Sequence, residues 1–135
     1  MLKLVELKVK PKYVLGNHES ACGLRRIIAL RSFGDVKAGD IGGWVAGYHN
    51  LSHTGDCWIY DDAEVHGNAY VCQNAIVMHE AKMYGRAVAS GNAVICGDAI
   101  ATGNVRIGTN AILHGSEYAD GDGVLTGYPA IVIRH

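Results

Sequence analysis

The chain has 135 residues, the size of a single domain, and a formal net charge of −1 at pH 7 with histidine neutral. A protein that binds DNA or RNA normally carries a basic patch, so this charge balance argues against nucleic acid as a partner. Residues 1–10 interrupt their apolar side chains with charge every two or three positions, which predicts neither a signal peptide nor a membrane span.

Residues 1–40 are predicted to form an N-terminal cap of β-strands. Residues 1–10 read as a half-exposed strand that ends at Pro11. Residues 16–20 (Gly-Asn-His-Glu-Ser) have turn chemistry, and residues 25–33 read as a second strand. The open end of a solenoid exposes core side chains and unpaired strand edges, so we expect these strands to cover the end of the repeat that follows.

Residues 41–135 are predicted to form a parallel β-helix. With Val65 as position one, an apolar residue returns at nearly every sixth position from Ile41 to Ile131, and no insertion interrupts the count. The third position of the hexad is mostly glycine and the fifth is mostly alanine. A hexapeptide repeat of this kind indicates an all-β solenoid, here of about five turns.

If three hexads close one turn, residues eighteen apart stack, and the first positions form three inward columns. The first column is large and aliphatic throughout: Ile41, Ile59, Val77, Ile95, Leu113 and Ile131. The other two columns contain Gly47, Val65, Met83, Ala101 and Ala119, and His53, Val71, Ala89, Ile107 and Leu125. Small residues in one column are offset by larger ones in another, as a constant packing density requires. His53 is then either a core histidine bonded to the cap or a residue with a ligand-binding or catalytic role.

Cysteine usage and one irregular hexad add two expectations. The four cysteines, at positions 22, 57, 72 and 96, have no C-x-x-C spacing, and Cys57 falls in an inward slot. They are expected to be reduced thiols of a cytoplasmic protein. Glu117 occupies an alanine slot, where an unpaired carboxylate would be costly. Either the turn opens there to solvent, or Glu117 meets a cation from His114 or Arg134.

The run Gly39-Asp40-Ile41-Gly42-Gly43-Trp44-Val45, together with residues 50–53 and 56–63, resembles the bacterial and prophage YdcK-like proteins. These are single-chain left-handed β-helices of hexapeptide repeats, and the resemblance covers roughly residues 25–115. It implies left-handed winding, which is not the usual hand of parallel crossovers. The wider hexapeptide superfamily includes CoA-dependent acyltransferases, usually trimeric, so the resemblance implies acyl transfer as one candidate activity.

One outer wall of the predicted solenoid is apolar. It comprises the outward residues on either side of the first column: Trp58, Tyr60, Ile76, Met78, Val94, Cys96, Ile112 and His114. Contiguous apolar patches on soluble proteins generally mark partner surfaces, and aromatic residues and methionine are typical of interface cores. We therefore expect a homo-oligomer, a trimer or a dimer, formed through this wall. The alternative is that a chain end folds back over it.

A second wall carries a possible ligand stripe. Tyr48, His66 and Tyr84 fall on one line at spacings of eighteen and could grip a planar or sugar-like ligand. The alternative is that these are ordinary surface residues, because tyrosine is common at exposed strand positions. The third wall is small and polar and is expected to be solvated.

Two functions from different classes remain. The preferred hypothesis is a non-catalytic scaffold that self-associates and binds a protein partner, for example as a phage- or prophage-encoded inhibitor, with no cofactor. The alternative is acyl transfer from acetyl-CoA with a histidine as general base, for which His66, His79 and His114 are the outward candidates. No carboxylate has a spacing that obviously orients them. The seven histidines are dispersed, so no metal site is expected within one chain, although symmetry could bring copies of His114 together.

Overall fold

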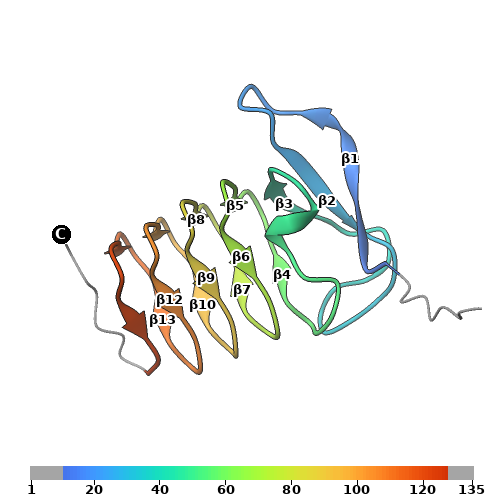
Figure 1. Cartoon of the computed structure of the whole chain (residues 1–135). Coiled ribbons are helices and arrows are strands. Elements are labelled where there is room, and N and C mark those ends of the chain that lie inside the picture. The colour runs from blue at the N-terminus through green and yellow to red at the C-terminus, as the bar shows by residue number, and fades with distance from the viewer. Residues whose placement is uncertain (1–10, 128–135) are drawn as a thin grey trace, which may run out of the picture.

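The computed structural model describes residues 11–127, which form a short antiparallel cap followed by a stack of parallel turns (Figure 1). The cap contains β1 (Tyr13–Glu19) and β2 (Arg25–Ala29), and β3 (Ile41–Val45) connects it to the solenoid. A 3-10 turn, η1 (Tyr48–Asn50), follows β3. The remaining strands have two residues each: β4 (Trp58–Ile59), β5 (Glu64–Val65), β6 (Tyr70–Val71), β7 (Ile76–Val77), β8 (Lys82–Met83), β9 (Val88–Ala89), β10 (Val94–Ile95), β11 (Ile100–Ala101), β12 (Arg106–Ile107), β13 (Ile112–Leu113), β14 (Tyr118–Ala119) and β15 (Val124–Leu125).

The strands of the solenoid stack in three parallel sheets. Their orders are β4-β7-β10-β13, β6-β9-β12-β15 and β3-β5-β8-β11-β14, and β2 and then β1 extend the third sheet at its N-terminal end. Val77 pairs with Ile95 and Ile95 with Leu113, eighteen residues apart, as the repeat predicts. The predicted all-β parallel solenoid of about five turns is therefore confirmed. Left-handed winding stays a prediction from the resemblance.

The hexad determines both the core and the corners of each turn. Inward residues of the middle turns, such as Met83 and Ile95, are fully buried, as are the alanines of the fifth position. At the corners the chain adopts positive φ, as at Gly85 (φ 67°), where a Cβ atom would lie 2.9 Å from the backbone nitrogen of Gly103. Glycine is therefore needed there for two reasons, the left-handed backbone and the close stacking of consecutive turns.

The first turn departs from the predicted register. Val45 pairs with Val65 and Leu51 bridges to Val71, both at a spacing of twenty residues, whereas Ile59 pairs with Val77 at eighteen. Two extra residues therefore lie between Leu51 and Ile59. The prediction of an unbroken count from Ile41 is wrong, and Ile41 is 64 % exposed instead of inward.

The shifted register places better core residues in the first turn. Val45 and Leu51 occupy the inward positions that were assigned to Gly47 and His53, and they are 0 % and 1 % exposed. Asn50 is also fully buried. Its Oδ1 accepts hydrogen bonds from the backbone nitrogens of Ala46 (2.9 Å) and Gly47 (3.1 Å), and its Nδ2 donates to the carbonyl of Ala69 (2.8 Å). The side-chain amide thus satisfies backbone groups where the regular ladder is interrupted.

The cap hairpin also differs from the prediction. Residues 16–20 do not form the turn, because β1 continues to Glu19 with a register shift between Leu15 and Glu19. The chain reverses after Ser20, whose Oγ accepts hydrogen bonds from the backbone nitrogens of Cys22 and Leu24. The second strand ends at Ala29, earlier than predicted. The strand predicted for residues 1–10 lies outside the described residues.

A buried lysine joins the cap to the first turn. Lys12 is 0 % exposed, and its Nζ donates to the carbonyls of Gly55 (3.2 Å) and Cys57 (2.7 Å) and lies 3.4 Å from Cys57 Sγ. Burial lowers the pKa of Lys12 and raises the pKa of Cys57. Cys57 is inward as predicted, and all four cysteines are free thiols. Because all three donors of the ammonium group have partners, the lysine can be buried here without a carboxylate.

His53 also contacts the cap. Its Nδ1 accepts a hydrogen bond from the backbone nitrogen of Lys12 (3.1 Å), and its ring stacks on Tyr13 with 4.2 Å between ring centroids. The predicted bond to the cap is therefore present, although His53 lies outside the inward column.

Candidate functional site

The outer face of the sheet β4-β7-β10-β13 carries a continuous apolar surface over its middle turns. Ile76, Val94 and Ile112 precede the inward residues and pair in register, so they form one line. Met78 and Cys96 follow the inward residues and lie beside that line. We call these five residues the apolar face. All five are half-buried, and none is charged.

Three other residues predicted for this wall, Trp58, Tyr60 and His114, lie outside the apolar face. Tyr60 packs partly against the core, and His114 is exposed at the C-terminal end. Trp58, expected to face outward, is only 2 % exposed, which corrects its place in the predicted interface. The cap covers it, because Phe33 packs edge-on against its ring at 5.3 Å and Tyr13 at 6.3 Å. The cap therefore covers the first turn of this sheet, while the turns from β7 to β13 keep the apolar face.

The predicted ligand stripe is only partly assembled. His66 and Tyr84 stack with ring centroids 5.2 Å apart and planes within 6°. Tyr48 does not continue this line, since the two extra residues of the first turn displace it. It lies in η1 instead, where its ring neighbours Tyr13 at 5.5 Å and His53 at 5.8 Å. The stripe is therefore a pair of aromatic rings and not a ladder of three.

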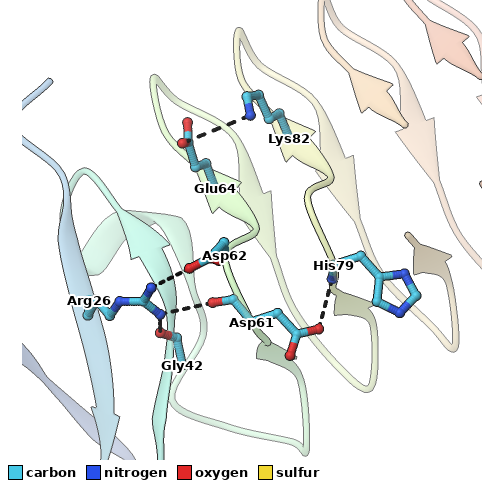
Figure 2. Close-up of polar contacts among 7 residues, drawn as sticks. All are labelled: Arg26, Gly42, Asp61, Asp62, Glu64, His79 and Lys82. Carbon is cyan, nitrogen blue, oxygen red and sulfur yellow. Dashed lines mark hydrogen bonds and ion pairs between the residues drawn. The ribbon is translucent and has the colours of Figure 1, made fainter. Parts of the chain in front are cut away.

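Charged side chains flank the His66–Tyr84 pair. Glu64 lies 4.0 Å from the Nζ of Lys82 and 4.0 Å from the Nε2 of His66 (Figure 2 shows the pair with Lys82). A carboxylate therefore does lie beside His66, because Glu64 is two residues earlier in the chain, although the sequence spacing did not single it out. At these distances and with partial exposure, such pairs contribute little to stability.

His79 has a structural role at a corner of the solenoid. It adopts positive φ (61°), and its backbone nitrogen donates to Asp61 Oδ2 at 3.0 Å (Figure 2). Its Nδ1 accepts a hydrogen bond from the backbone nitrogen of Gly97 at 3.0 Å. The neutral ring then carries its proton on Nε2 and has no free acceptor nitrogen. This arrangement argues against His79 as a general base.

His114 is accompanied by Glu117, the carboxylate in the alanine slot. Glu117 Oε1 accepts a hydrogen bond from the backbone nitrogen of His114 at 2.8 Å and lies 3.9 Å from its Nε2. The glutamate side chain is 30 % exposed. Glu117 therefore reaches solvent, as one of the two alternatives expected, and it lies beside His114. The other partner considered for it, Arg134, lies outside the described residues. His66 and His114 each have a carboxylate nearby, and the side chain of His114 is the more exposed of the two, 52 % against 32 %.

One arginine at the cap, Arg26, is fixed in place by contacts that were not predicted from the sequence. Arg26 lies over the ring of Trp44, with 4.6 Å from its guanidinium carbon to the ring centroid. It donates hydrogen bonds to the carbonyls of Gly42 (2.9 Å) and Asp61 (3.0 Å) and to the carboxylate of Asp62 (Figure 2). No local pattern could reveal this cluster, because Asp61 and Asp62 lie 35 and 36 residues from Arg26.

The part of the chain that the structure describes shows neither a cluster of metal ligands nor a membrane-spanning helix. Within residues 11–127 no group of three or more histidine, cysteine, aspartate or glutamate side chains converges as a metal site would require. The same residues contain no helix of the length and hydrophobicity needed to span a membrane.

Comparison with known proteins gives one partial relative. No family model matches the chain. Over 63 residues it is 40 % identical to the uncharacterized acetyltransferase YdcK of Escherichia coli K12. The matched region is 46 % of this chain but 19 % of that protein. The match and the hexapeptide solenoid together confirm the predicted resemblance to YdcK-like hexapeptide-repeat proteins.

Proposed function

We propose that the protein is a β-helical binding scaffold that self-associates through the apolar face. The observation that carries this proposal is the continuous line of Ile76, Val94 and Ile112, flanked by Met78 and Cys96, on one sheet. Three consecutive turns present the same chemistry at the same position. A soluble monomer rarely keeps a contiguous apolar surface, and burial against a partner would remove it from water.

A second copy of the chain is the occupant that fits this face. The face carries no charged side chain, so two copies in contact would bury apolar groups against apolar groups without removing a charge from water. Its strands repeat at a regular spacing, so side chains of one copy can lie between those of the other. Such a scaffold requires no cofactor and leaves the polar faces free for a protein partner. Its cytoplasmic location, and a host or phage protein as that partner, stay predictions.

The test compares two valine substitutions in neighbouring strands. Val94 in β10 belongs to the apolar face, whereas Val88 in β9 is also outward and half-buried but lies on another sheet. Burying an uncompensated carboxylate in an interface costs several kcal/mol, so Val94→Glu should give a monomer. Val88→Glu should keep the mass of the wild-type protein. Light scattering at several concentrations measures the mass, and circular dichroism confirms that both variants are folded.

Three outcomes would contradict this proposal. The first is a wild-type chain that stays monomeric at every concentration. The second is an oligomer that Val94→Glu leaves intact, which would place the contact on another surface. A shift in mass with both substitutions would indicate a general loss of structure instead of a specific interface, and it would also count against the proposal.

Acyl transfer is the second candidate, because the partial relative is described as an acetyltransferase. In this chain the supporting geometry is His114 beside Glu117, whose carboxylate could stabilise a protonated imidazole while His114 takes a proton from an amine or hydroxyl acceptor. Acetyl-CoA would be the donor. The test is steady CoA release across a panel of amine and hydroxyl acceptors, with loss of release in His114→Gln. Absence of release with every acceptor would remove this candidate.

A further inference from the structure

A row of apolar side chains lies on the outer face of the cap. It includes Ile41, which the sequence predicted to face inward. Val14 in β1 pairs with Ile28 in β2, and Ile28 pairs with Ile41 in β3, so three aliphatic side chains lie in one row across three strands. Ile41 is 64 % exposed and Val14 is 36 % exposed. Single exposed apolar residues are ordinary, but a row of them is characteristic of a binding surface.

A hollow of about 310 Å³ opens beside this row. Its walls are formed by Gly16, Asn17, His18, Arg26, Ile28, Ile41 and Trp44. Register shifts between Leu15 and Glu19 and between Arg26 and Ile28 border it on two strands. Such irregularities re-aim side chains and often occur next to functional sites. The volume is at the low end of the range for small-molecule sites, which limits the occupant to one or two rings.

Arg26 gives the hollow a flat polar wall that is held in place. One side of its guanidinium group lies over Trp44, and its hydrogen bonds to Gly42, Asp61 and Asp62 fix its orientation (Figure 2). The side chain nevertheless stays 31 % exposed at the hollow. A guanidinium plane attracts the face of an aromatic ring, and a plane that is already fixed loses little entropy when a ring stacks on it.

We propose that this hollow binds a small uncharged aromatic molecule, whose ring stacks on Arg26 and contacts Ile28 and Ile41. The charge of Arg26 is already balanced by Asp62, so a carboxylate on the ligand gains little. A cationic ligand would find no carboxylate among the residues that line the hollow. Asn17 and His18 at the exposed rim offer hydrogen bonds to one polar substituent of the ring. This site does not depend on self-association, because it lies on a different sheet from the apolar face.

The proposal is tested with three probes of similar size on the full-length chain. Indole is the aromatic probe, cyclohexanol the aliphatic one and benzoate the anionic one. Indole at millimolar concentration should shift the methyl resonances of Ile28 and Ile41 and the indole N–H resonance of Trp44. Cyclohexanol should bind at least fivefold more weakly, and benzoate no more tightly than indole. Equal binding of indole and cyclohexanol, or no shift with indole, would overturn the proposal.

Gly16 provides a matched pair of variants. Its φ is not in the left-handed region, and a Cβ atom would lie 3.5 Å from the carbonyl oxygen of Arg26 and 3.6 Å from Ile28 Cδ1, which is ordinary contact. Gly16→Ala should therefore keep indole binding, whereas the longer side chain of Gly16→Leu should fill the hollow and weaken binding at least tenfold. Equal affinity in both variants would contradict the proposed location. If Gly16→Leu does not fold, Ile41→Ser on the exposed wall should weaken indole binding, and unchanged affinity there would also count against the site.

Discussion

At the scale of single residues, His53 makes the junction between the cap and the first turn sensitive to pH. Burial, and then the positive charges of Lys12 and Arg31, hold the pKa of His53 below its ordinary value of 6.5. As the pH falls below 6.5, the unfolded chain takes up a proton that folded His53 does not. The free energy of unfolding should therefore decrease from pH 7 towards pH 5, as measured by denaturant titration at each pH.

His53→Asn is the control for this pH dependence. The asparagine Oδ1 can accept the hydrogen bond from the backbone nitrogen of Lys12, but the side chain does not titrate in this range. The loss of stability on acidification should be smaller in the variant than in the wild-type chain. An identical pH dependence in both proteins would mean that His53 is not the group responsible.

Residues of the cap junction also show what the sequence could and could not predict. The cap bond of His53 was one of two alternatives that the sequence left open, and its partner Lys12 lies 41 residues away. The inward place of Cys57 was predictable, because the hexad count is a local feature. The burial of Lys12 was not. A lysine is normally exposed, and its carbonyl partners lie 43 and 45 residues away in the chain. Only the folded arrangement brings three acceptors to one ammonium group.

At the scale of elements, β3 contains two adjacent glycines, Gly42 and Gly43, that allow it to pack closely against the next turn. A Cβ atom at Gly43 would lie 2.5 Å from the carbonyl oxygen of Ala63 and 2.5 Å from Ile59 Cγ2. Because the first of these is backbone, no side-chain rotation relieves the clash. Gly43→Ala should therefore destabilise the protein by about 3 kcal/mol or more, in the upper part of the range for point substitutions. The measurement is the free energy of unfolding by denaturant titration.

Gly115 is the matched comparison for Gly43. It has φ of 60°, but no atom lies within 4 Å of the added Cβ position. Gly115→Ala should then cost only the backbone strain of the left-handed conformation, about 1–2 kcal/mol. Equal losses for the two substitutions would show that close approach is not what β3 requires.

The same strand explains why its register could not be predicted. Ile41, Gly47 and His53 stay in phase with the later hexads, so the sequence pattern favours them as inward residues. Val45 and Leu51 are also six residues apart and larger than Gly47 in volume, and the structure selects them. Which of the two registers forms depends on the close approach of Gly43 to Ile59 in β4 and to Ala63 just before β5, and on the packing of the cap against this turn. These contacts between distant segments leave no trace in a six-residue period.

At the scale of the whole molecule, the first residue of each strand in the solenoid donates its backbone hydrogen bond to the following turn. Examples are the bonds from Tyr70 to Ala87 (3.0 Å), from Val88 to Val105 (3.0 Å) and from Arg106 to Gly123 (2.9 Å). The protection of these amides therefore depends on the C-terminal neighbour of each turn. Val124 is the first residue of β15, and within residues 11–127 no turn follows β15 to accept the corresponding hydrogen bond.

This pattern predicts that the first strand residue of the last described turn exchanges its amide proton faster than those of the interior turns. The amide of Val124 should exchange at least about a hundredfold faster than the amides of Tyr70 and Val88, because exposed end groups open locally while interior turns open only with larger units of structure. Hydrogen exchange followed by nuclear magnetic resonance measures all three in one sample. Val88 and Val124 lie on the same sheet and are both valines in two-residue strands, so they form a matched pair. Equally slow exchange at Val124 would contradict an open end and would require a further strand to pair with β15.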